Sequence, residues 1–251
     1  MAGHSHAKNV MHQKSKVEAK RSKFFSKLVR EITVAAKQGL PDPAHNPRLR
    51  AAVADARKNS LPRERIERAI KASQPGSGEN TNYDEVRYEG YGPGGCAVIV
   101  EALTDNRNRT AAELRTIFLK NGGTMGESGS VAFMFTRLAE IVFAAKVATA
   151  DAMLEAVIEA GGENVETTAE SHVVTCPVED FGTVRDALEK QFGESESAKL
   201  VWYPNNLVPV TGDAAQQMLK LVDALDDNDD AQTVTGNFDI SDEDMEAFAA
   251  S

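Results

Sequence analysis

One glycine-rich stretch divides this 251-residue chain into two parts that differ in hydrophobic periodicity. The stretch is QPGSGENTN, from Gln74 to Asn82, and its Gly, Ser and Asn content is typical of a linker. Before it, apolar residues recur every three or four positions, as on one face of a helix. After it, short strand-like runs alternate with helical runs. We therefore expect an all-helical part followed by a mixed part of the α+β class.

The part before the linker predicts three helices. From about Lys16 to Lys37, one apolar stripe runs at helical spacing. A second helix is predicted in NPRLRAAVADARKNS, with Asn46 as its N-cap and Pro47 at its first position. A third is predicted in LPRERIERAIKAS. Short connections between these helices favour a small bundle, which together with a basic N-terminal arm would form a domain over residues 1–78.

The part after the linker predicts two α+β domains, one inserted into the other. Strands are expected in YDEVRYEGY and CAVIVEALT, joined by the turn GPGG, and in SVAFMF; Thr110 and Glu113 form a capping box for the helix between them. Residues 137–204 follow the order βαββαβ, which is the ferredoxin-like motif. The strands and helix after it would complete the first domain. The predicted domains are therefore 79–136 plus 205–238, an inserted domain 137–204, and an acidic tail 239–251.

Charge is divided unevenly along the chain. Residues 1–80 contain 17 Lys and Arg and 7 Asp and Glu, whereas residues 81–251 contain 11 and 31. The formal net charge is −10, yet the first part alone is strongly basic. Such asymmetry indicates a polyanionic partner for the basic part. It argues against a protein that coats nucleic acid with its whole surface.

The C-terminal stretch is the acidic counterpart of the N-terminal part. After Lys220 it contains ten acidic residues and no Lys or Arg. The favoured interpretation is a solvated acidic tail. The alternative is that this stretch folds over the basic helix and competes with nucleic acid.

Several classes of protein are disfavoured by the sequence. No apolar run approaches the ~20 residues of a membrane span, so no membrane partner is expected. Cys96 and Cys176 lie far apart in predicted strands and favour buried, reduced thiols in a cytoplasmic protein. His4, His6 and His12 lack nearby co-ligands, so we expect no metal and no other cofactor. No catalytic signature is present, and GPGG lacks the Lys-Ser/Thr of a phosphate loop; an enzyme with a small-molecule substrate is not predicted.

Seven stretches together resemble the YebC/PmpR family, which includes mitochondrial translational activators of the same type. They are AGHSHAKNVMH, KRSKFFSKLVREITVAAKQG, DPAHNPRLRAAVADAR, YEGYGPGG, LTDNRNRT and GGTMGESGSVAFMF, with the short RAI of the third helix. The resemblance covers essentially the full chain. One departure is that Gln13 stands between His12 and Lys14, where the family often has Arg. The resemblance implies a helical domain followed by two α+β domains, one inserted into the other.

The candidate nucleic-acid contacts are basic side chains that could neutralise phosphates. Most lie along the first helix and its arm, where spacings of three and four would form a stripe: Lys8, Lys14, Lys16, Lys20, Arg21, Lys23, Lys27 and Arg30. The alternative for this stripe is a solvated helix face. Arg48 and Arg50 would either extend the positive surface or pair with acids one helical turn away.

The motif TDNRNRT and the two aromatic residues of VWYP supply the remaining candidates. Arg107 and Arg109 precede a predicted helix, where an anion is favoured, whereas Asn106 and Asn108 are better explained as parts of a structural turn. Trp202 is expected in the core. Tyr203 has the better chance of exposure and of stacking on a base.

The resemblance also implies two functions. The first is a DNA-binding transcriptional regulator; the alternative is a ribosome-associated translation factor that binds ribosomal RNA and relieves stalling at difficult sequences such as proline runs. Both are nucleic-acid-binding regulators of gene expression and neither is an enzyme. The partners expected from the sequence are therefore DNA or ribosomal RNA, in the second case on the ribosome.

Overall fold

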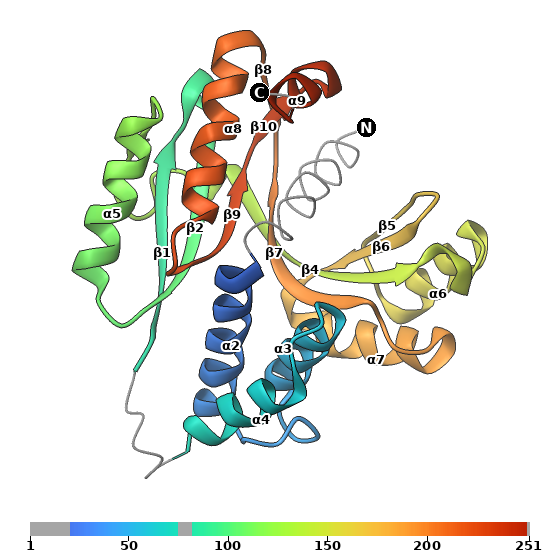
Figure 1. Cartoon of the computed structure of the whole chain (residues 1–251). Helices are drawn as coiled ribbons and strands as arrows, with labels where there is room; N and C mark the ends of the chain where they lie inside the picture. The colour runs from blue at the N-terminus through green and yellow to red at the C-terminus, as the bar shows by residue number, and fades with distance from the viewer. Residues whose placement is uncertain (1–20, 75–81, 250–251) are drawn as a thin grey trace.

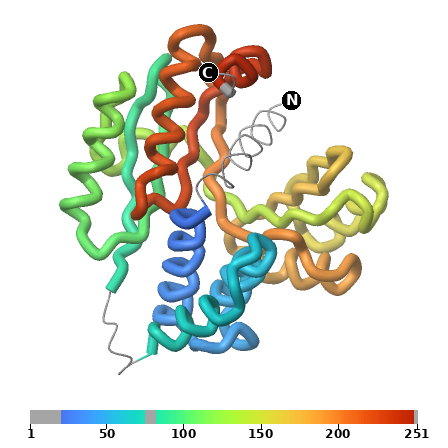
Figure 2. Tube along the Cα trace, viewed as in Figure 1, coloured from blue at the N-terminus to red at the C-terminus, as the bar shows by residue number. Residues whose placement is uncertain are grey.

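The computed structural model describes residues 21–74 and 82–249, which form three packed parts (Figures 1 and 2). In Figure 2 a helical domain, in blue and cyan, lies below a first sheet domain in green and red and beside an inserted domain in yellow and orange. Figure 1 places the same parts by element. The predicted α+β class, with an N-terminal helical domain and sheet domains after it, is confirmed.

The helical domain consists of α2 (Arg21–Gln38), α3 (Pro47–Lys58) and α4 (Arg63–Ala72). Its core is the apolar stripe of α2, where Leu28 and Ile32 are buried against the other two helices. Asn46 is the N-cap of α3, because its side chain accepts from the backbone N–H of Leu49 at 3.0 Å, as the sequence predicted. The bundle therefore follows directly from helical periodicity and capping residues.

The first sheet domain has the strand order β3-β1-β2-β9. Its strands are β1 (Asp84–Tyr91), β2 (Ala97–Thr104), β3 (Thr124–Met125) and β9 (Ala231–Gly236), and its helices are α5 (Arg107–Lys120) and α8 (Gly212–Asp226). Val98 and Val100 of β2 belong to the same buried cluster as Leu114 of α5 and Leu221 of α8, so both helices cover one face of the sheet. The predicted GPGG turn joins β1 to β2 antiparallel, and two of its glycines have φ of 75°.

The inserted domain is a ferredoxin-like βαββαβ unit. Its elements are β4 (Phe135–Ala144), α6 (Ala150–Ala160), β5 (Asn164–Thr167), β6 (Ser171–Cys176), α7 (Phe181–Phe192) and β7 (Ser197–Pro204). The strand order is β5-β6-β4-β7, with every pair antiparallel. The chain enters by β4 and leaves by β7. Because these strands are neighbours, the entry and exit points lie together at the first sheet domain.

Two segments differ from the strands that the sequence predicted. SVAFMF is not a strand over its first part: Ala132–Met134 form a 3-10 turn, and β4 begins at Phe135. The backbone N–H groups of Gly129, Val131 and Ala132 are taken by the buried carboxylate of Glu89, so they cannot join a ladder. In addition, β8 (Val208–Val210) pairs in parallel with β10 (Phe238–Ile240) and does not extend the first sheet.

The acidic C-terminal segment is not the solvated tail that the sequence favoured. After β10 it forms α9 (Asp242–Ala249), which lies against α8. Ile240 is buried, and Met245 and Phe248 pack on the core of the first sheet domain. These apolar residues, placed among acidic ones, explain why the segment folds back onto the protein.

The carboxylate of Glu89 should be a main determinant of the 129–132 loop. Burial alone would raise the pKa of Glu89, but three backbone hydrogen bonds and Arg87 outweigh burial and lower it. Replacing Glu89 with Gln puts an amide donor against backbone donors. We expect the free energy of unfolding to fall by about 2 kcal/mol.

The measurement is urea unfolding, together with amide hydrogen exchange at Gly129, Val131 and Ala132. Glu127→Gln, an exposed change in the same loop, is the control and should alter stability by less than about 0.5 kcal/mol. Unchanged exchange at the three amides in Glu89→Gln would contradict this role.

Candidate nucleic-acid interface

One side of α2 meets an acidic turn of the first sheet domain. This side, the basic face, carries Lys23, Lys27 and Arg30 at helical spacing. The acidic turn is residues 226–230, DDNDD, which join α8 to β9. Lys23 Nζ donates to the backbone oxygen of Asp227 at 3.1 Å and to its carboxylate at 3.0 Å. Lys27 Nζ donates to the last backbone carbonyl of α8 at 2.6 Å.

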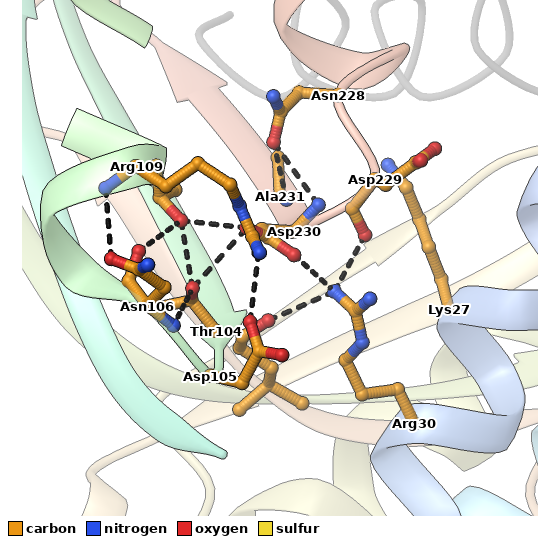
Figure 3. Close-up of polar contacts among 12 residues, drawn as sticks. Lys27, Arg30, Thr104, Asp105, Asn106, Arg109, Asn228, Asp229, Asp230 and Ala231 are labelled. Carbon is orange, nitrogen blue, oxygen red and sulfur yellow. Dashed lines mark hydrogen bonds and ion pairs between the residues drawn. The ribbon is translucent and has the colours of Figure 1, made fainter. Parts of the chain in front are cut away.

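Arg30 makes the deepest contact between the two domains. Its Nη1 donates to the Asp230 carboxylate at 2.9 Å and to the backbone oxygen of Leu103 at 2.9 Å. The Asp230 side chain is only 5% exposed. Its other oxygen accepts from Thr110 Oγ1 at 2.6 Å and from Arg109 Nη2 at 2.7 Å. Figure 3 shows Arg30, from α2, and Arg109, from α5, both pointing toward Asp230.

Burial and charge act in opposite directions on the groups of this interface. Burial is the largest influence on the Lys27 ammonium and lowers the pKa of Lys27, while carboxylates of the acidic turn oppose that shift. Burial would raise the pKa of Asp230, but hydrogen bonds from Thr110 and Arg109 and the charge of Arg30 outweigh it and lower the pKa. Asp230 is therefore held ionised although it is buried.

The motif TDNRNRT is built into the same network. Asn106 is the N-cap of α5, because its side chain accepts from the backbone N–H of Arg109 at 3.1 Å. The helix begins at Arg107, so the predicted capping box of Thr110 and Glu113 is wrong. Thr110 lies inside the first turn, and its hydroxyl donates to the buried carboxylate described above. In a capping box this hydroxyl would have accepted from the backbone N–H of Glu113; in the structure it donates to a carboxylate distant in sequence.

Two further candidates pair with acids elsewhere. Arg48 Nε donates to Glu31 at 2.8 Å, and its Nη1 binds Glu85 of β1, which links α3 to the first sheet domain. Arg107 Nε donates to Asp84 at 2.8 Å in an exposed ion pair. An exposed pair such as Arg107–Asp84 stabilises a protein by at most about 1 kcal/mol, so a polyanion can displace it.

Arg21 and Arg50 are the exposed candidates without a carboxylate partner in the described parts of the chain. Arg50 donates to the backbone carbonyls of Pro43 and Ala44 at 3.0 and 3.1 Å. The Arg21 guanidinium lies over the ring of Phe25, with its carbon 5.2 Å from the ring centroid.

The structure therefore brings Lys23, Lys27, Arg30 and Arg109 together, but onto aspartates of the same chain. The arrangement is an ionic interface between the helical domain and the first sheet domain. The partner of these cations is the acidic turn, which belongs to the stretch after Lys220 that the sequence, as its alternative interpretation, placed over the basic helix. Its signal was the run DDNDD, in which Asn228 accepts from the backbone N–H groups of Asp230 and Ala231 and closes the turn.

Some candidates lie outside the described residues. They are Lys8, Lys14, Lys16 and Lys20, together with His4, His6 and His12. Over residues 21–74 and 82–249, no group of three or more His, Cys, Asp and Glu side chains is placed to hold a metal ion. In the same ranges, every helix is too short or too polar to cross a bilayer.

The aromatic candidates are already occupied by neighbouring groups. Guanidinium carbons of Arg87 and Arg137 lie 5.0 and 4.8 Å from the Trp202 ring centroid, which leaves the ring poorly placed for base stacking. Tyr203 is partly buried, and its hydroxyl donates to Glu140 at 3.0 Å. Burial and that carboxylate raise the pKa of Tyr203. The expectation that Tyr203 is the more available of the two is not supported.

Comparison with known proteins gives two family matches and a structural one. Residues 5–76 match the TACO1/YebC protein N-terminal domain, and residues 83–238 match the TACO1/YebC second and third domain. A crystal structure described as a conserved hypothetical protein from Aquifex aeolicus has a TM-score of 0.81 and 44% sequence identity to this chain. The similarity covers 91% of this chain and 94% of that one.

Asp230 should be the main contributor to stability in this interface. Asp230→Ala removes the carboxylate that Arg30, Arg109 and Thr110 share and leaves a buried charge uncompensated, so we expect the free energy of unfolding to fall by about 3 kcal/mol. Because the folded-state pKa of Asp230 lies below its unfolded value, its contribution is complete above about pH 5 and is lost as pH falls through the folded-state pKa. The deficit of the variant should therefore shrink in acid.

Urea unfolding between pH 7 and pH 3 measures both effects. Asp229→Ala is the matched control, since that side chain is 73% exposed and its nearest cation, Lys23, is 3.9 Å away. Equal losses in the two variants, or a deficit for Asp230→Ala that does not depend on pH, would refute this assignment.

Proposed function

We propose that this chain, which belongs to the TACO1/YebC family, is a nucleic-acid-binding regulator of gene expression. Family membership supports a regulatory role in general. The observation that carries the nucleic-acid part is the division of charge: residues 21–74 contain 13 Lys and Arg against five Asp and Glu. The helical domain is thus a basic module on an acidic protein, and a phosphate backbone is the partner that such a module attracts most strongly.

The first proposed target is DNA, which would make the protein a transcriptional regulator. Contacts from Lys and Arg to phosphates are independent of sequence, so they would supply affinity and not specificity. At physiological ionic strength the Debye length is about 8 Å. Acidic groups of the sheet domains that lie farther than this from the helical domain would therefore not cancel attraction there, but would repel DNA from the remaining surface.

Ribosomal RNA is the alternative target, with the protein acting as a translation factor in the cytoplasm. The same charge distribution favours it, because a protein with one basic module and an acidic remainder can insert that module into a large RNA surface. The two proposals predict that different nucleic acids are bound to the protein in a cell, so an experiment can distinguish them.

The proposal includes no chemical step. The two thiols, Cys96 and Cys176, are buried, and burial raises the pKa of each to about 11. A thiol in this state is a poor nucleophile at neutral pH. The carboxylates of Asp230, Glu85 and Glu196 are engaged in ion pairs that join domains.

Crosslinking of the full chain in living cells, followed by sequencing of recovered DNA and RNA, tests the proposal. Discrete DNA sites without ribosomal RNA would identify a transcriptional regulator, and enriched ribosomal RNA would identify a translation factor. The control changes Lys8, Lys14, Lys16 and Lys20 to Gln; we expect recovery to fall about tenfold or more, because phosphate contacts add to affinity. Recovery of neither nucleic acid above the uncrosslinked sample would contradict the proposal.

A further inference from the structure

Much of the positive charge in the helical domain is already matched inside the protein. The basic face of α2 meets the acidic turn, Arg48 binds Glu31, and Lys58 binds Glu196 of the inserted domain at 3.0 Å. On α4, Arg63 binds Glu67 at 2.6 Å. Within the described residues, the exposed cations of this domain without a carboxylate partner are Arg21, Arg50, Arg57, Arg65, Arg68 and Lys71.

Two of these arginines converge on one aromatic ring although they come from different helices. The guanidinium carbon of Arg21, on α2, lies 5.2 Å from the centroid of the Phe25 ring. The guanidinium carbon of Arg65, on α4, lies 5.8 Å from the same centroid. Both arginines are exposed, and Phe25 is partly buried against the core of the helical domain.

Helix geometry places this cluster away from the acidic turn. Arg21 and Lys23 are two residues apart, which on an α-helix separates their directions by about 200°. Phe25 follows Arg21 by one turn and continues toward the core residue Leu28. The side of α2 that bears Arg21 is therefore opposite to its basic face, and the aspartates at 226–230 do not neutralise it.

The cation–π contacts with Phe25 prepare the two guanidinium groups for an anion. An aromatic ring in contact with a guanidinium group restricts the motion of a long side chain, so less entropy remains to be lost on binding. The N–H groups of Arg21 and Arg65 lie at the edges of the planes and donate to no other residue in the described parts of the chain. An arginine fork of this kind matches the paired oxygens of a phosphate.

We infer that Arg21 and Arg65, held on Phe25, form a clamp for the phosphate backbone of nucleic acid. The inference rests on the proposed function and names the surface that carries it. It also moves the contact surface within the described residues from the basic face, which binds the acidic turn, to the opposite side of α2 and the adjoining side of α4.

Fluorescence anisotropy of the full chain with a labelled 20-nucleotide single-stranded RNA and a labelled 20-base-pair DNA of mixed sequence tests the clamp. The variant is Arg21→Gln with Arg65→Gln. We expect affinity for the better-bound probe to fall by about tenfold or more for each arginine, and the slope of log K against log salt to become shallower by about 1 for each.

The matched control is Arg57→Gln with Arg63→Gln. It removes the same charge from α3 and α4, but Arg57 contacts no aromatic ring among the described residues and Arg63 is already paired with Glu67. A melting curve for each variant checks the fold. A second variant, Arg21→Lys with Arg65→Lys, keeps the charge but not the fork, and should recover only part of the lost affinity.

Each possible result either supports or overturns the clamp. A selective loss in the Arg21 and Arg65 variant supports the clamp. Equal losses in both double variants, or no loss in either, would overturn the clamp and leave the proposed function standing. Full recovery by lysine would show that only charge matters and would overturn the fork geometry. If an oligoaspartate peptide binds as tightly as the nucleic acids, nucleic acid is not the partner. If the wild-type chain binds neither probe, the proposed function fails and the clamp with it.

Discussion

The contact between the helical domain and the first sheet domain is centred on one buried ion pair. Asp230 would be costly to bury as an isolated carboxylate, and it is kept ionised because Arg30 approaches it from α2 while Arg109 and Thr110 approach it from α5. One side chain therefore joins three segments that are distant in sequence. A separation of the helical domain from the sheet would leave this carboxylate with part of its partners missing.

This constraint changes how the charge of the helical domain is to be understood. A basic stripe on a helix suggests an open surface for a polyanion, but Lys23 and Lys27 reach backbone and side-chain oxygens of the acidic turn. Those cations fix the orientation of α2. The exposed guanidinium groups of Arg21, on the opposite side of α2, and of Arg65, on α4, then become the groups free to meet a partner.

The inserted domain is connected in a different way. It leaves and rejoins the first sheet domain through neighbouring strands, β4 and β7, and Trp202 sits at that junction. Arg87 of the first domain and Arg137 of the inserted domain lie over the two-ring system of Trp202, whose indole N–H donates to Glu101 at 3.2 Å. An aromatic residue that would suit base stacking is thus used to join two domains.

The sequence by itself determined the helices α2 to α8, the βαββαβ order and the insertion, because hydrophobic periodicity and caps such as Asn46 act within a few residues of the chain. It also located the excess of positive charge. The tertiary structure alone decided the partners of that charge. Asp230 is 200 residues from Arg30, and no local pattern predicts that contact. The same holds for Thr110, which looked like a helix cap until a distant carboxylate was brought beside it by folding. Local rules set which elements form, whereas long-range packing sets which charges remain available.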